Sequence, residues 1–150
     1  MVDKVLFSSE SSEWHTPKEL FHELNYYFNF DLDPCTTEDN PLNTPHFFTI
    51  KDNGLEKEWF GNVFVNPPYN KEIEKWLKKA KHELRNGFTR HVVFLLPART
   101  DTKWFHQYIY DTKKWDFKFH VKLRFLKGRL KFGNSKNSAP FPSMIVIFSR

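Results

Sequence analysis

The hydrophobic and polar positions along this chain follow a helical period in three places. Residues 71–87 have the clearest pattern, with apolar residues three and four positions apart, Lys and Glu between them, and a glycine at the end. An earlier helix is expected to open with Thr16 as N-cap and Pro17 at the first helical position. Its apolar stripe consists of Leu20, Phe21, Leu24, Tyr27 and Phe28. A third, short helix is expected within residues 101–113.

Between these helices the pattern is that of strands. Residues 91–98 form a continuous apolar run, as in a strand buried on both faces of a parallel sheet. Alternating or β-branched runs predict further strands at 28–35, 46–50, 61–65, 116–125, 128–133 and 144–148. Helices alternate with strands through the first two thirds of the chain, and strands dominate the last third. The fold class is therefore α/β, with a mostly parallel sheet, helices on both of its sides and a late antiparallel strand or hairpin.

Length and composition fit one domain. The chain has 150 residues, of which 18% are aromatic, enough for a substantial core. Residues 1–13 are polar towards their end and lack periodicity, so we expect a loosely ordered segment there and a single domain over 14–150. The one cysteine excludes an internal disulfide and a multi-cysteine zinc site, and it fits a reducing cytoplasm. The sequence contains no signal peptide, no membrane-spanning run and no convincing cluster of metal ligands.

The net charge of the chain indicates which class of binding partner to expect. Lys and Arg outnumber Asp and Glu by 23 to 18, and the sequence pI is about 9.3. This excess favours a polyanionic partner such as nucleic acid. The Lys-rich face of residues 71–85 is interspersed with Glu, which is more typical of a solvated helix face than of a DNA-binding patch.

Polar side chains follow three of the predicted strands, at the edge where ligands bind in open α/β sheets. They are Asp33, Asp52 and Asn66. Asp52 lies 19 residues after Asp33, close to the offset of about 20 at which a carboxylate reaches a ribose hydroxyl in nucleoside-binding sheets. A nucleoside that carries a positive group would fit between the two carboxylates.

The third of these strands ends in a rigid shelf, Asn66-Pro67-Pro68-Tyr69. Both prolines have a fixed φ and lack an N–H, and the proline after Asn66 holds that residue extended. The shelf offers an amide side chain, backbone carbonyls and an aromatic ring. Plainer interpretations stay open: the shelf as a stiff turn, Asp33 and Asp52 as turn residues, and Thr16 as a helix cap only.

The chain carries six short motifs: Trp14-His15-Thr16-Pro17, Leu32-Asp33-Pro34-Cys35, Asp52-Asn53-Gly54-Leu55 with Trp59, Asn66-Pro67-Pro68-Tyr69, Leu96-Pro97-Ala98-Arg99-Thr100-Asp101 and Gly128-Arg129-Leu130. In this order they resemble the phage-type DNA adenine-N6 methyltransferases, a Dam-like family that uses S-adenosylmethionine. The resemblance covers most of residues 14–148. Asn-Pro-Pro-Tyr alone is shared with protein and RNA methyltransferases, whereas the whole set is more specific.

The resemblance implies a Rossmann-like fold and transfer of a methyl group from S-adenosylmethionine to N6 of adenine in DNA, with S-adenosylhomocysteine as the other product. The catalytic residues implied are Asn66, Pro67, Pro68 and Tyr69. The Asn66 side-chain oxygen and the Pro67 carbonyl would accept the two N–H bonds of the amine and stabilise the charge that develops on nitrogen. Tyr69 would stack on the base, which must first be flipped out of the duplex.

The resemblance also implies how the cofactor is held. Asp33 would face the methionine amine, and Thr16 with the helix start after it would receive the methionine carboxylate. Asp52 is expected at the ribose, with Glu38 and Asp39 as nearby alternatives. The turn after the first strand lacks a Gly-x-Gly loop and resembles an Asp-Pro-Phe form with a cysteine in third place. The full expected set is Trp14, Thr16, Pro17, Asp33, Pro34, Cys35 and Asp52.

The expected partner is DNA, without a membrane and without a separate target-recognition domain. Arg99, Thr100, Lys103 and Arg129 are expected to bind it, and phosphate contact is the hypothesis for the two arginines, beside a purely structural role. A monomer is compatible with the sequence, which leaves the oligomeric state open. The expected location is the cytoplasm of a bacterial or phage-infected cell. Two other functions stay open: a methyltransferase for RNA adenine or protein glutamine, and a non-catalytic nucleic-acid-binding protein on the same scaffold.

Overall fold

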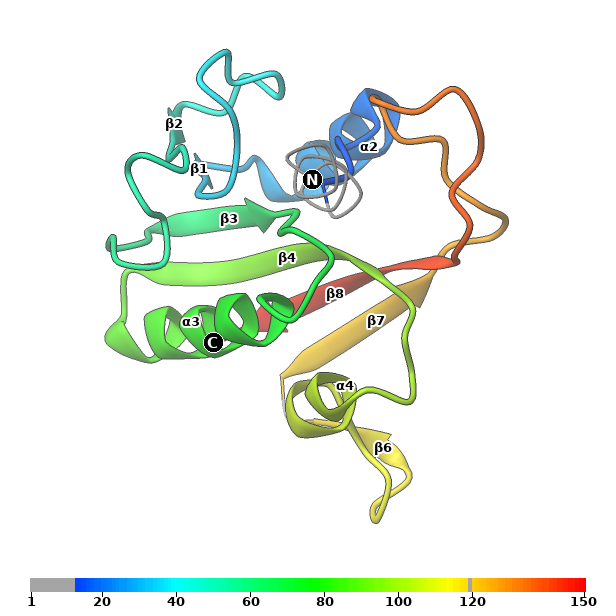
Figure 1. Ribbon diagram of the computed structural model, residues 1–150. Coiled ribbons are helices and arrows are strands. Elements are labelled where there is room, and N and C mark those ends of the chain that lie inside the picture. The colour runs from blue at the N-terminus through cyan, green and yellow to red at the C-terminus, as the bar shows by residue number, and fades with distance from the viewer. Residues whose placement is uncertain (1–12, 119) are drawn as a thin grey trace, which may run out of the picture.

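The computed structural model describes residues 13–118 and 120–150 and is built around a six-stranded sheet (Figure 1). The strand order is β2-β1-β3-β4-β8-β7. Four strands at one side of the sheet are parallel: β1 (Leu32–Asp33), β2 (His46–Phe47), β3 (Gly61–Val65) and β4 (Thr89–Pro97). The last strand of the chain, β8 (Ser143–Ser149), runs antiparallel between β4 and β7 (Val121–Phe125). The predicted mixed sheet with a late antiparallel strand is confirmed.

Helices cover the sheet from two sides, as Figure 1 shows. The helix α3 (Ile73–Asn86) packs beside β4 and lies in front of the end of β8 in this view. The helix α2 (Lys18–Phe28) lies beyond β3, where the Phe21 ring packs 5.3 Å from Phe64. The short α4 (Lys103–Tyr108) follows β4 and leads into a separate two-stranded sheet. That sheet pairs β5 (Tyr110–Asp111) with β6 (Asp116–Phe117).

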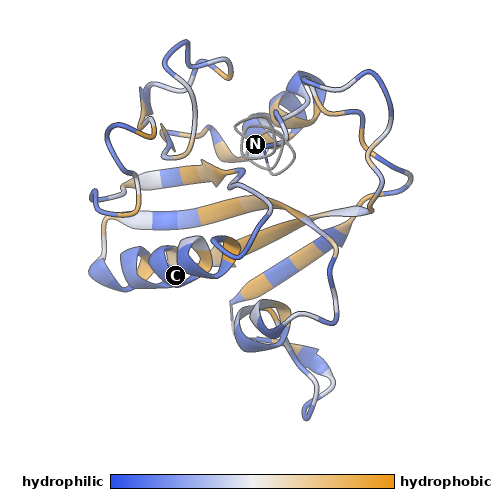
Figure 2. Ribbon diagram, in the orientation of Figure 1, coloured by the Kyte–Doolittle hydropathy of each residue, from blue (hydrophilic) through white to orange (hydrophobic). Residues whose placement is uncertain are grey.

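The core lies where the sequence is apolar at the right period. Residues 92–96 of β4 are fully buried, as expected for a strand covered on both faces, and Figure 2 shows the apolar colour gathered on β3, β4 and β8. The helix α3 buries its apolar stripe, and Gly87 ends it in the left-handed conformation with φ 96°. Each fully buried apolar side chain stabilises the fold by about 1.5–3 kcal/mol.

The start and end of α2 differ from the prediction. Thr16 is not the N-cap: Pro17 occupies that position, no side chain caps the helix, and the helix begins at Lys18. The Thr16 side chain is bonded elsewhere, as described below. Tyr27 is 75% exposed and not part of the apolar stripe. Phe28, which was also expected in the stripe, is half-buried and stacks on Phe30 at 5.5 Å.

Four predicted strands also differ. The strand expected at 46–50 is shortened to β2. The strand expected at 28–35 is reduced to β1, because its first residue still belongs to α2. The strand expected at 116–125 is divided into β6 and β7. The strand expected at 128–133 is wrong, because this part of the β7–β8 connection is irregular. Its Gly133 N–H donates to the His15 carbonyl, and the neighbouring Asn134 side chain bonds to His15 and Glu13.

Two expectations concern the ends of the chain and membranes. Residues 1–12 of the expected loose segment lie outside the described residues. Among the described residues, no helix is long and apolar enough to cross a membrane.

Candidate active site

The strand order creates a switch point between β1 and β3. The chain passes from β1 outwards to β2 and then returns to the other side of β1 to form β3. Ligands of open α/β sheets bind in the crevice outside the carboxyl ends of the strands at such a point. Asp33 is the last residue of β1 and Asn66 follows the last residue of β3, and the register pairs Leu32 with Val63. The fold therefore places the two polar groups on which the sequence hypothesis depends at the carboxyl ends of neighbouring parallel strands.

Both N–H groups of the Asn66 side chain are used. The amide nitrogen Nδ2 donates to the Trp14 carbonyl at 2.5 Å and to Thr16 Oγ1 at 2.9 Å. The amide oxygen Oδ1 is buried and has no hydrogen-bond partner within the described part of the chain. Unpaired buried oxygens are uncommon because losing water without a new partner costs about 1–3 kcal/mol. The Asn66 oxygen is thus an acceptor held ready for a donor that the protein does not supply.

The two prolines after Asn66 differ in the hydrogen bonding of their backbone carbonyls. The Pro68 carbonyl accepts from the Asn70 N–H at 3.0 Å. For the Pro67 carbonyl no N–H donor is found among residues 13–118 and 120–150. A second acceptor therefore stands next to the Asn66 amide, on a backbone that the proline rings hold stiff.

Tyr69 is buried instead of lying open on the shelf. It is 5% exposed, and its hydroxyl donates to the Leu95 carbonyl at 3.1 Å. Its ring meets the rings of Phe132 and Phe141 nearly edge-on, at centroid distances of 6.0 and 5.7 Å. Burial raises the pKa of Tyr69 well above its usual value, while the positive charge of Arg99 opposes that rise.

Trp14 joins this arrangement from the other end of the sequence. Its ring packs against Phe132 at 5.3 Å and against Phe141 at 5.1 Å. We call Trp14, Tyr69, Phe132 and Phe141 the aromatic cluster. Phe132 and Phe141 were missed by the sequence reasoning. Their only signal is that they are large aromatic residues, Phe132 in the strand expected at 128–133 and Phe141 in the Asn-, Ser- and Pro-rich segment after it.

Asp33 is a buried carboxyl at the end of β1, only 2% exposed. Burial raises its pKa from 3.8 to about 7, against the opposing effects of the Cys35 N–H and the Thr36 side chain. The Cys35 N–H donates to Asp33 Oδ1 at 3.3 Å. No basic side chain in the described ranges forms an ion pair with it. The site therefore suits a cationic group brought by a ligand.

The turn after Asp33 is tightly supported. Pro34 is buried and Cys35 is half-buried. Burial, together with the nearby charge of Asp33, raises the pKa of the Cys35 thiol, so this group stays protonated at neutral pH. The backbone of Gly54 passes so close that a Cβ there would lie 2.0 Å from the Pro34 carbonyl oxygen. Gly54 thus belongs to the packing of this turn, a role that the sequence motif alone did not predict.

Asp52 lies in an exposed turn after β2. Its Oδ2 accepts from the Thr49 N–H at 2.8 Å and from the Thr49 hydroxyl at 3.1 Å, and the first of these bonds lowers the pKa of Asp52 most. Asp52 therefore stabilises its own turn, which is the plainer of its two interpretations. Of the two alternatives for the ribose, Glu38 pairs with Lys51 at 2.9 Å and Asp39 accepts from Thr37 at 2.5 Å.

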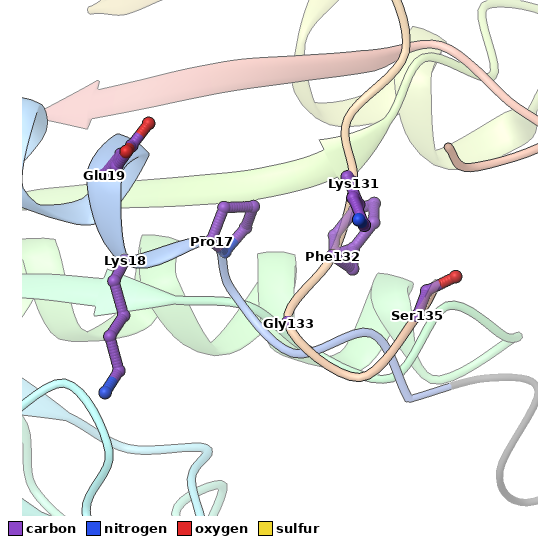
Figure 3. Close-up of a pocket in the computed structure, with 7 residues that line it drawn as sticks. All are labelled: Pro17, Lys18, Glu19, Lys131, Phe132, Gly133 and Ser135. Carbon is purple, nitrogen blue, oxygen red and sulfur yellow. The ribbon is translucent and has the colours of Figure 1, made fainter. Parts of the chain in front are cut away.

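An open hollow of about 340 Å³ lies between the start of α2 and the β7–β8 connection (Figure 3). It is lined by Pro17, Lys18, Glu19, Lys131, Phe132, Gly133 and Ser135. Figure 3 shows Lys18 and Glu19 pointing away from each other at the helix start. Of the expected cofactor residues only Pro17 lines this hollow, so it is a neighbour of the Asn66 site and not the site itself.

The residues expected to bind DNA are all on the surface. Arg99, Thr100 and Lys103 are exposed directly after β4, and the Arg99 carbonyl accepts from the Thr102 hydroxyl at the start of α4. Arg129 is exposed in the β7–β8 connection. In residues 13–118 and 120–150 no group of three or more His, Cys, Asp or Glu is arranged to hold a metal ion.

Comparison with known proteins shows the family to which the chain belongs. A family model described as DNA N-6-adenine-methyltransferase (Dam) matches residues 5–150. The chain is also 30% identical over 143 residues to a DNA N-6-adenine-methyltransferase of Haemophilus phage HP1 (strain HP1c1). That alignment covers 93% of this chain and 80% of the phage protein. The resemblance suggested by the six motifs is confirmed, and the chain belongs to the DNA N-6-adenine-methyltransferase (Dam) family.

Proposed function

We propose that this adenine-specific DNA methyltransferase works through the Asn66 side-chain oxygen and the Pro67 carbonyl, which accept the two N–H bonds of the adenine amine. The amine is a weak nucleophile because its lone pair is delocalised into the ring. Two fixed acceptors draw its protons out of the ring plane and stabilise the positive charge that grows on nitrogen as it attacks. Acceptors fixed in advance in a site without water do this without reorganisation during the reaction.

The observation that carries the proposal is the unpaired Asn66 oxygen. The amide has its two donors engaged by Trp14 and Thr16 and its acceptor left open and buried. Buried acceptors are usually satisfied. Asn62 Oδ1 is also buried and unpaired, but it lies at the start of β3, whereas Asn66 Oδ1 lies at the carboxyl end of that strand, where ligands bind. The exocyclic amine of adenine is a donor of matching chemistry.

We further propose S-adenosylmethionine as the methyl donor, with Asp33 as the partner of its ammonium group. The buried carboxyl of Asp33 lacks a cation of its own among the described residues and lies across the switch point from Asn66. When bound, the cofactor supplies a methyl group made electrophilic by its sulfonium sulfur. An ammonium group beside Asp33 would lower the raised pKa of the carboxyl and stabilise its charged form.

The proposed stacking of Tyr69 on the base depends on a rearrangement of the aromatic cluster. Stacking on the base requires an accessible ring face, and Tyr69 is 5% exposed because it packs against Phe132 and Phe141. In the proposed function the flipped base therefore enters as these two rings withdraw. Until then Tyr69 supports the shelf through its bond to the Leu95 carbonyl.

The remaining assignments complete the proposal. Arg99, Thr100, Lys103 and Arg129 are exposed and would contact DNA beside the switch point. Residues 14–150 would act as one domain that both binds and methylates DNA. The phage origin of the similar protein supports action in the cytoplasm of a bacterial host.

Methyl transfer with Asn66→Ala tests the proposal. Labelled S-adenosylmethionine is incubated with unmethylated duplex DNA, and nucleoside digestion identifies the product. Wild-type protein should place label in N6-methyladenine, and Asn66→Ala should reduce the rate at least about 100-fold, because a preorganised group at the reacting atom typically contributes that much.

Asn86→Ala is the matched control. Asn86 is an exposed asparagine at the far end of α3, and its loss should leave the rate unchanged. Near-normal activity of Asn66→Ala, with the fold intact by circular dichroism, would contradict the proposed role of the shelf.

A further inference from the structure

The orientation of the Asn66 amide is set by the segment 14–16. A side-chain amide can be rotated by half a turn, which exchanges its oxygen with its nitrogen. The Trp14 carbonyl has only acceptor capacity, so it requires the nitrogen of Asn66 on its side. The rotated amide would place two oxygens against each other. The Thr16 hydroxyl accepts the second amide proton at 2.9 Å, which holds the amide plane as well as its direction.

The segment that supplies these two acceptors is itself held in place. The Trp14 ring is packed against Phe132 and Phe141 in the aromatic cluster. The Gly133 N–H donates to the His15 carbonyl at 2.8 Å. Asn134 bonds to this segment twice, accepting from the His15 N–H at 3.0 Å and donating to the Glu13 carbonyl at 2.9 Å. Residues more than 100 positions apart in the sequence thus meet to fix the place of two hydrogen-bond acceptors.

Thr16 is not needed where the sequence suggested it. It does not cap α2, which has Pro17 in its N-cap position and no side-chain cap. Its hydroxyl oxygen instead accepts a hydrogen bond from the Asn66 side-chain amide. A hydroxyl that accepts one bond still has its own proton to donate, so contact with a cofactor carboxylate is compatible with this bond.

We propose that Thr16 is a positioning residue for Asn66, which it holds so that the Oδ1 atom alone faces the substrate amine. This inference rests on the proposed catalytic role of Asn66. It adds that the amide is aimed before any ligand arrives, by an acceptor pair that includes the Thr16 side chain. Thr16 acts through Asn66 and has no contact with the reacting nitrogen.

The variants Thr16→Val and Thr16→Ser distinguish a positioning role of Thr16 from a role in cofactor binding or in stability. Valine keeps the shape of threonine but removes the acceptor, and serine keeps the hydroxyl. With saturating DNA and cofactor, Thr16→Val should lower kcat at least about 10-fold, since loss of alignment at the reacting atom is costly. The KM for DNA should change less than about threefold, and Thr16→Ser should recover most of kcat.

An NMR measurement without ligands tests whether the hydrogen bond between Asn66 and Thr16 exists. The two side-chain amide protons of Asn66 are identified in ¹⁵N–¹H spectra by their loss in Asn66→Ala. In Thr16→Val one of the two should move upfield, and in Thr16→Ser it should return. No change in either resonance would overturn the proposal, because the bond that it depends on would be absent.

The alternative roles of Thr16 would each give a different result in these experiments. Unchanged kcat in Thr16→Val, with weaker cofactor binding by calorimetry, would make Thr16 a cofactor ligand and overturn the positioning role. A lowered melting temperature with normal kcat per folded molecule would make it structural and overturn the role as well. Activity that survives in Asn66→Ala would instead remove the proposed function on which the inference rests.

Discussion

Asp33 carries a carboxyl group that has been almost fully removed from water at the end of β1. In the unfolded chain it ionises near pH 3.8, whereas burial raises its pKa to about 7 in the folded protein. Between these two values the folded protein binds a proton that the unfolded chain has lost. The contribution of Asp33 to the free energy of unfolding is therefore most favourable below about pH 4, falls as pH rises to about 7, and is constant above that.

Asp33→Asn should change this pH dependence. The amide stays neutral at every pH, so the variant should have the higher free energy of unfolding at pH 8 and a smaller advantage at pH 5. Each unit of pKa shift corresponds to about 1.4 kcal/mol, so a difference of a few kcal/mol at pH 8 is the upper range. Urea unfolding at both pH values measures it. Parallel curves for the two proteins would contradict a raised pKa at Asp33.

The same substitution should weaken binding of the cofactor, because the carboxylate that would face its ammonium is gone. A gain in stability with a loss of affinity is a pattern that a purely structural residue would not give. Calorimetry at pH 8 makes the comparison, since wild-type Asp33 is then mostly ionised. Equal affinities would remove Asp33 from the cofactor site.

At the scale of elements, α3 supports the turn after β1 through a short chain of contacts. Lys79 pairs with the buried Glu83 at 2.6 Å, and Glu83 accepts from the Trp59 N–H at 3.3 Å. The Trp59 indole donates to the Gly54 carbonyl at 2.8 Å. Gly54 in turn lies against Pro34. The helix therefore holds the loop 54–59 in the position from which it closes on the Asp33 turn.

Gly54→Ala should disturb this arrangement. Its Cβ would lie 2.0 Å from the Pro34 carbonyl oxygen, a backbone atom that can move only with the turn. We expect a loss of about 1–3 kcal/mol in the free energy of unfolding, as for other overpacked sites, and weaker cofactor binding. Urea unfolding and calorimetry measure the two effects. Gly133→Ala is the control, because the nearest atom to its Cβ would lie 3.6 Å away, and a loss of similar size there would count against the close contact at Gly54.

Elements with a strong period were predictable from the sequence, and those fixed by distant contacts were not. The strand β3 was predicted with its observed bounds, and α3 with its glycine end, because local pattern and burial agree there. In the expected strand at 128–133, the Gly133 N–H donates to the His15 carbonyl and not to a neighbouring strand. Thr16 failed as a cap because its hydroxyl is drawn to Asn66. In both cases a partner far along the chain outweighed the local preference.

The candidate site likewise contains one part that was predictable from the sequence and one part that depends on distant contacts. The meeting of Asp33 and Asn66 follows from strand order, which an alternating α/β pattern already suggests. The aromatic cluster depends on Trp14 meeting Phe132 and Phe141 across the molecule, and no local pattern reports such a contact. This cluster buries Tyr69, which in the proposed function stacks on the base only after the rings of Phe132 and Phe141 withdraw.

At the scale of the whole molecule, the question is which face meets DNA. The formal net charge of +5 attracts a polyanion to the protein without choosing a face. Arg99 follows the carboxyl end of β4 and influences the buried phenol of Tyr69, so its charge lies near the shelf. Arg85 is equally exposed but lies in the last turn of α3, just before β4 begins at the opposite edge of the sheet. The two arginines have the same charge and differ in their distance from the proposed site.

Comparing Arg99→Ala with Arg85→Ala therefore separates local contact from general attraction. Each phosphate neutralised by the protein contributes about 0.9 to the slope of log affinity against log salt. Arg99→Ala should weaken duplex binding and reduce that slope by about 1, whereas Arg85→Ala should leave the slope unchanged. Fluorescence anisotropy over a range of salt concentrations gives both slopes. Arg129→Ala should behave like Arg99→Ala if the β7–β8 connection lies along the same strand of DNA. Equal slopes for Arg99→Ala and Arg85→Ala would mean that DNA is attracted by total charge alone, and the face around the switch point would then have to recognise the flipped base without help from Arg99.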